Sequence, residues 1–140
     1  MSDQTWRSVT LRRVAAGRFV ATNAKGVELT VSGRDDDAFS PVELLLAAIA
    51  GCAALDVDAL TSRRAEPESF ELRAGGDKLR DDSGNHLANL EVIFEVAFPP
   101  GEGGEAARSV LPDLVARSHD RLCTVTRTVE LGTPVRFRIG

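Results

Sequence analysis

The sequence is poor in basic charge and in long apolar runs, and each shortage excludes a class of protein. With 17 Lys and Arg against 21 Asp and Glu, the chain carries a formal charge of −4 and offers no basic surface to phosphate backbones. We therefore expect no nucleic-acid partner. The longest apolar run, Leu44 to Leu55, is shorter than the ~20 residues of a membrane span, and Asp56 and Asp58 follow it. We expect a buried helix here and no membrane partner.

Metal and nucleotide motifs are also missing. The two histidines, His86 and His119, and the two cysteines are too few and too scattered for the short-spacing patterns of zinc sites. The glycines at 101–104 lack the lysine and the spacing of a phosphate-binding loop. Asp56 and Asp58 do not share a helix face, so we expect them to solvate the end of the apolar run. The sequence predicts no metal and no cofactor.

The N-terminus lacks the basic start and apolar stretch of a secretory signal, which predicts a cytoplasmic protein. In that reducing compartment, two cysteines are more often reduced, catalytic or merely buried than joined in a permanent bridge. Cys52 is flanked by small residues from Ala50 to Ala54, which leave open space around its sulfur. A core cysteine is the alternative, because free cysteine is among the most buried residue types.

What is present indicates one α+β domain over residues 1–140, a length that can bury its own core. Period-two alternation and intervening turn residues predict several strands, and apolar periodicity predicts a second helix with an interruption or kink at Pro112. We expect strands at 8–11, 19–21, 27–31, 69–73, 90–98 and 135–139, polar loops at 33–37 and 77–84, and the second helix at 105–121. The strands at 69–73 and 90–98 should form an antiparallel pair.

The clearest local signal lies at the start of the central helix. Ser40 fits an N-cap, Pro41 the first helical position, and Glu43 the third residue after the cap, which together predict a capping box. The helix should run from there and stop before Pro67. It is apolar around its whole circumference from residue 44 to residue 55, so it must be covered on every side. Burial against a second copy of the chain would supply that cover.

Two segments together resemble a known family. Ser-Pro-Val-Glu-Leu-Leu-Leu-Ala-Ala-Ile-Ala-Gly-Cys at 40–52 and Leu-Cys-Thr-Val-Thr-Arg-Thr at 122–128 are similar to the paired signature of the OsmC/Ohr family of thiol-dependent hydroperoxide reductases. The resemblance runs in order from about Arg18 to the C-terminus, with Thr124 in place of the usual proline. It implies an OsmC-like fold, in which a long central helix packs against antiparallel sheets in an intertwined homodimer.

The resemblance also implies roles for individual residues. Cys52 matches the cysteine whose thiolate attacks a peroxide and becomes a sulfenic acid, and Cys123 matches the one that condenses with it into a disulfide. An external dithiol, such as a lipoyl group, then reduces that disulfide. Arg18 lies where the family places the arginine that stabilises the thiolate, and a solvated turn arginine is the alternative.

One position departs from the family pattern. In the organic hydroperoxide resistance branch a glutamate pairs with the arginine, and that position here is Val42. Glu43 lies one residue later, which turns it by ~100° around the helix. We retain Glu43 as a catalytic candidate, with closure of the capping box on Ser40 as its alternative role.

The resemblance implies a cysteine-based peroxidase that reduces organic hydroperoxides or hydrogen peroxide through Cys52 and Cys123. A different class stays open: a non-catalytic dimer that binds a small ligand or senses redox state through the same cysteines. Val42 favours this alternative, whereas the presence of both cysteines favours the enzyme. A purely structural cysteine pair is the third interpretation.

Overall fold

The computed structural model describes residues 5–34 and 37–140, which form two compact units that meet in sequence after Leu45. The first unit contains a three-stranded antiparallel meander in the order β1-β2-β3. Its strands are β1 (Val9–Ala15), β2 (Arg18–Asn23) and β3 (Glu28–Ser32). The first three predicted strands are therefore confirmed. Asp35 and Asp36 of the predicted polar loop lie outside the described residues.

Helix α1 (Pro41–Thr61) begins where its sequence predicts. The Ser40 backbone N–H donates to Glu43 Oε1 at 2.9 Å, and the Glu43 backbone N–H donates to Ser40 Oγ at 3.2 Å. These two reciprocal hydrogen bonds satisfy amides that the first helical turn leaves without intrahelical partners. The predicted capping box is confirmed.

Helix α1 buries one narrow stripe of its surface. The buried residues are Ile49, Ala53, Val57 and Thr61, four positions apart and so on one face of the helix. By length and composition, the whole of α1 could cross a membrane, although the run at 44–55 alone is too short to do so. The core helices of soluble proteins can have the same length and composition. Only 22% of the apolar window of α1 is buried, so the cover expected on every side of the helix is not present within the described part of this chain.

The second unit is built on a long hairpin, β4 (Ser69–Asp81) and β5 (Gly84–Ala97). The antiparallel pairing is confirmed, but the predicted loop at 77–84 is wrong, because pairing continues to Asp81 opposite Gly84. The turn is tight because Asp81 Oδ1 accepts the Ser83 backbone N–H at 2.8 Å and Gly84 adopts a φ of 124°. A bulge between residues 75 and 77 shifts the register by one residue, and the pairing then continues along the polar stretch.

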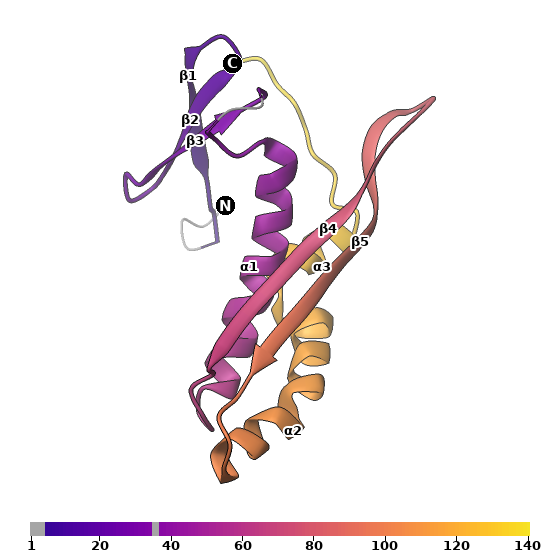
Figure 1. The fold of residues 1–140 in the computed structure, drawn as a ribbon. Helices are drawn as coiled ribbons and strands as arrows, with labels where there is room; N and C mark the ends of the chain where they lie inside the picture. The colour runs from indigo at the N-terminus through magenta and orange to yellow at the C-terminus, as the bar shows by residue number, and fades with distance from the viewer. Residues whose placement is uncertain (1–4, 35–36) are drawn as a thin grey trace. The chain divides into compact units, whose positions relative to one another are not determined.

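Three helical segments follow the hairpin: α2 (Glu102–Arg117), the π-helical turn η1 (Ser118–Leu122) and α3 (Thr124–Glu130). Pro112 lies inside α2, which continues past it, so the second predicted helix is confirmed without a break at the proline. Near the start of α2, a Cβ on Gly104 would lie 1.7 Å from the carbonyl oxygen of Pro99. Only glycine fits that contact. In Figure 1 the β4–β5 ribbon passes alongside α1, and α2 and α3 follow in orange and yellow.

The strand predicted at 135–139 is wrong. Residues 133–140 have no regular secondary structure, and Val135, Phe137 and Ile139 are 78%, 93% and 103% exposed. Alternating apolar residues suit a strand, but a strand also needs a neighbour for its backbone hydrogen bonds. Within the described residues this segment has no such neighbour.

Candidate functional site

The structure brings three chemically active side chains together from two distant parts of the second unit. Cys52 and Asp56 lie one turn apart on α1, and Cys123 lies between η1 and α3. The two sulfur atoms and an Asp56 carboxylate oxygen are all within 4.8 Å of one another. Both cysteines are free thiols, Cys123 fully buried and Cys52 half-buried. A peroxide-reactive pair requires this kind of proximity.

Local hydrogen bonds fix the sulfur of Cys123. It accepts the backbone N–H of Thr126 at 3.4 Å, and its thiol donates to Thr126 Oγ1 at 3.2 Å. The Cys123 backbone N–H donates to the Ser118 carbonyl at 2.8 Å and closes the π-helical turn. Thr124, which replaces the family's proline, is the first residue of α3, where proline is favoured but not required.

Asp56 is part of this site and does not merely solvate the end of the apolar run, so that expectation is wrong for Asp56. Ser118 Oγ donates to Asp56 Oδ2 at 2.9 Å, and Ser118 is 1% exposed. The hydrogen bond therefore fixes the carboxylate beside the two thiols. Asp58, the other acidic residue that follows the apolar run, is exposed. Sequence reasoning missed Asp56 because its partner Ser118 comes from η1, far along the chain.

The surroundings of Cys52 hold it in the thiol form. Burial raises the pKa of Cys52, and the Cys123 thiol and the Asp56 carboxylate raise it further, while a hydrogen bond from the backbone of Val125 lowers it. The balance is upward, which opposes formation of the thiolate that a peroxide-reactive cysteine uses.

Arg18 and Glu43, the other two predicted site residues, belong to the first unit. Arg18 opens β2 and its Nη2 pairs with Asp37 Oδ1 at 3.0 Å. Glu43 forms the capping box described above, which gives its carboxylate a structural task at the start of α1. Their roles at the Cys52 sulfur stay predictions.

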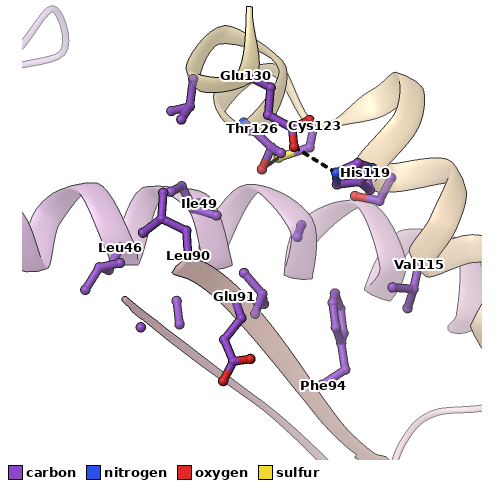
Figure 2. A pocket seen from close by; sticks show the side chains of 16 residues that line it. Leu46, Ile49, Leu90, Glu91, Phe94, Val115, His119, Cys123, Thr126 and Glu130 are labelled. Atoms are coloured by element: carbon purple, nitrogen blue, oxygen red, sulfur yellow. Dashed lines mark hydrogen bonds and ion pairs between the residues drawn. The ribbon is translucent and has the colours of Figure 1, made fainter. Parts of the chain in front are cut away.

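A pocket of about 220 Å³ opens beside the thiols. Apolar side chains of α1 and β5, among them Ile49, Leu90 and Phe94, line one side, and the η1–α3 segment lines the other (Figure 2). Cys123 reaches this pocket and Cys52 does not line it. The cavity is therefore an apolar space with a thiol in its wall.

His119 ties η1 to the end of α3 at the rim of this pocket. Its Nδ1 lies 2.8 Å from Asp120 Oδ1 and its Nε2 lies 3.1 Å from Glu130 Oε2, the contact dashed in Figure 2. Hydrogen bonds to Asp120 and then to Glu130 raise the pKa of His119. Sequence spacing gave no sign of this role, because Glu130 approaches only once α3 has formed.

A family model described as OsmC-like protein matches residues 33–138. The chain therefore belongs to the OsmC-like protein family, as its two cysteine segments predicted. An uncharacterized protein of Mycobacterium tuberculosis is 26% identical over 131 residues, covering 92% of this chain and 93% of the relative. An uncharacterized protein of Mycobacterium bovis matches equally well.

Solved structures share the fold. The OsmC-like protein of unknown function from Vibrio cholerae has a TM-score of 0.73 at 15% identity, covering 90% of this chain and 94% of its own. An OsmC-like protein from Mycoplasma pneumoniae has a TM-score of 0.72 at 14% identity, covering 90% and 88%. The organic hydroperoxide resistance protein OhrB of Bacillus subtilis has a TM-score of 0.55 at 17% identity, covering 89% and 91%. The predicted α+β, OsmC-like fold is confirmed.

Proposed function

We propose that the protein is a cysteine-based peroxidase with Cys52 as nucleophile and Cys123 as resolving thiol. The observation that carries this proposal is the free thiol pair, whose sulfur atoms lie within 4.8 Å. Neighbours in fold named organic hydroperoxide resistance proteins, from Bacillus subtilis and Elizabethkingia anophelis, support it. Membership of the family also fits the more general conclusion that the cysteine pair has a redox role.

The proposed reaction is balanced in atoms and electrons with these two residues, the peroxide and an external dithiol. The Cys52 thiolate attacks the distal oxygen of ROOH, the O–O bond breaks, and the alkoxide takes a proton to leave as ROH. Cys52 is then a sulfenic acid. The Cys123 sulfur attacks the Cys52 sulfur, the S–O bond breaks, and water leaves with the Cys123 proton. An external dithiol, such as a lipoyl group, reduces the disulfide by exchange and itself becomes a disulfide.

Arg18 is our candidate for the cation that this chemistry needs. A guanidinium keeps its charge at any working pH and lowers the pKa of a thiol beside it. Glu43 is retained as the residue that could orient Arg18, but both hydrogen bonds of its capping box favour a structural role. The substrate is an organic hydroperoxide or hydrogen peroxide; the apolar pocket lined by Ile49 and Phe94 is bordered by Cys123 and not by Cys52, so its walls do not select between the two.

We also propose that the protein acts as a homodimer in the cytoplasm. Helix α1 leaves Leu45 and Leu55 exposed at 37% and 73%, and the tail exposes Phe137 at 93%. Exposed apolar surface of this kind is typical of a partner interface. A second copy would cover it. Membership of the OsmC-like family supports this location.

A second candidate function is a non-catalytic dimer that binds a small ligand or senses redox state. Two observations favour it: the pKa of Cys52 is raised by burial, and Val42 replaces the family's glutamate. A sensor needs only slow, reversible oxidation of the pair, whereas an enzyme needs fast turnover.

One assay separates the two. Purified protein is given cumene hydroperoxide with either a lipoyl dithiol or a monothiol, and peroxide consumption is followed over many turnovers. A peroxidase consumes peroxide catalytically with the dithiol, and the Cys52→Ser variant does not. Consumption that stops at one equivalent per chain would support the sensor and contradict the enzyme.

A further inference from the structure

The reduced site also contains the donor atoms of a metal centre. Two thiols and one carboxylate, from Cys52, Cys123 and Asp56, have their ligand atoms within 4.8 Å of one another. In a tetrahedral zinc site, Zn–S distances of ~2.3 Å and Zn–O distances of ~2.0–2.2 Å place neighbouring ligand atoms roughly 3.4–3.8 Å apart. If the three ligand atoms move about 1 Å closer together, which side-chain adjustment allows, they reach the spacing of a zinc site.

The surrounding groups already orient these ligands. Ser118 holds Asp56 through Oδ2 at 2.9 Å, and the backbone N–H of Thr126 points at the Cys123 sulfur at 3.4 Å. The backbone of Val125 makes the corresponding hydrogen bond to the Cys52 sulfur. Outer-shell hydrogen bonds of this type fix ligand geometry in metal sites.

The donor chemistry selects the class of ion. Two thiolates exclude Mg²⁺ and Ca²⁺, which prefer oxygen ligands, and favour a softer cation such as Zn²⁺. His119 is not a ligand, because its nitrogens already bind Asp120 and Glu130. Three protein ligands leave the fourth position for water, and the adjoining pocket reaches both Ser118 and Cys123.

We propose that the reduced protein binds one Zn²⁺ through Cys52, Cys123 and Asp56, with water as the fourth ligand. Each thiol releases its proton to solvent as its sulfur bonds to the metal, and no electrons are transferred. A Cys52–Cys123 disulfide removes two of the three ligands, so oxidation expels the ion. Zinc and peroxide therefore compete for the same thiols. The proposal does not depend on peroxidase activity.

Cobalt titration tests this site directly. Reduced full-length protein is titrated without oxygen with Co²⁺, whose bonds to thiolates give a near-ultraviolet charge-transfer band, and Zn²⁺ is then added to displace it. We expect one Co²⁺ per chain, loss of the band in Cys52→Ser and in Cys123→Ser, and no band in peroxide-oxidised protein. Ser118→Ala should weaken binding by about 10–100-fold.

Asp58→Asn is the matched control for Asp56→Asn, because both lie on α1 and only Asp56 reaches the thiols. We expect Asp56→Asn to weaken Co²⁺ binding at least as much as Ser118→Ala, and Asp58→Asn to bind like the unmodified protein. Far-ultraviolet circular dichroism shows that each variant is folded. Equal affinity in the two Asp variants, a band that survives either Cys substitution, or no band in protein with two titratable thiols would each overturn the proposal.

Discussion

The two sides of the thiol site are built very differently. Cys52 lies on α1, a helix of 21 residues that buries a continuous stripe. Cys123 lies between a five-residue π-helical turn and a seven-residue helix, tied down by the exposed contacts of His119. A disulfide requires the sulfurs to close to about 2.05 Å. The difference lies in what holds each sulfur atom: helix packing on the Cys52 side, and local hydrogen bonds to Thr126 on the Cys123 side.

Removal of either thiol should have the largest effect and should divide the two sides by role. Cys52→Ser should abolish peroxide consumption. Cys123→Ser should keep the first turnover and trap Cys52 as sulfenic or sulfinic acid, because the resolving thiol is gone. Mass spectrometry of intact protein after one equivalent of peroxide distinguishes these states. If Cys123→Ser also loses the first turnover, the division of roles is wrong.

Replacement of Arg18 should have the next largest effect and should act on the α1 side alone. If Arg18 stabilises the Cys52 thiolate, Arg18→Met raises the Cys52 pKa and slows its alkylation at pH 7 about tenfold for each pKa unit. Alkylation at high pH should be unchanged. Arg12→Met, an exposed change on β1, is the control. Equal alkylation rates for the two variants would remove Arg18 from the site.

Loss of the N-cap hydrogen bond at Ser40 should destabilise α1 without changing the reactivity of Cys52. Ser40→Ala should lower the free energy of unfolding by roughly 0.5–2 kcal/mol, because it removes an N-cap hydrogen bond. Glu43→Gln should lower it less and leave the alkylation of Cys52 nearly unchanged. Urea unfolding measures the first effect and iodoacetamide kinetics the second. A strongly altered Cys52 pKa in Glu43→Gln would instead make Glu43 a catalytic partner.

Neutralisation of Asp56 should give a smaller change of opposite sign to that of Arg18. The carboxylate is the weakest of the groups that raise the Cys52 pKa. Asp56→Asn should therefore lower that pKa and speed alkylation at pH 7 by less than about tenfold, which is the effect of one pKa unit. Asp58→Asn is the control, and slower alkylation in Asp56→Asn would contradict the electrostatic account.

The His119 contacts should give the smallest effect, confined to the η1–α3 side. The pKa of His119 is raised in the folded protein, so its ion pairs stabilise the fold below its ordinary pKa of ~6.5 and lose that effect as pH rises through the folded value. Since the side chain is 56% exposed, solvent screening limits the contribution to less than about 1 kcal/mol. His119→Gln should therefore be destabilising at pH 5.5 and nearly neutral at pH 8.5, as measured by urea unfolding.

The features that depend on residues close together in the sequence were predictable. The capping box at Ser40 and the alternation of β4 and β5 follow from local spacing, and the two cysteine segments carry the family signature. The extension of the hairpin through Asp81 was not predictable, because cross-strand pairing overrides the low strand propensity of polar residues. The place of Asp56 in the site depends on Ser118, which only tertiary folding brings near.

Gly104 has a consequence for genetic screens of this protein. Because the Pro99 carbonyl occupies the space of its Cβ, every replacement at this position must displace backbone. A saturation library selected for activity should thus deplete Gly104 variants as strongly as variants of the two cysteines. Protein abundance measured in the same library would separate them, since the cysteine variants persist as folded protein while those of Gly104 are degraded.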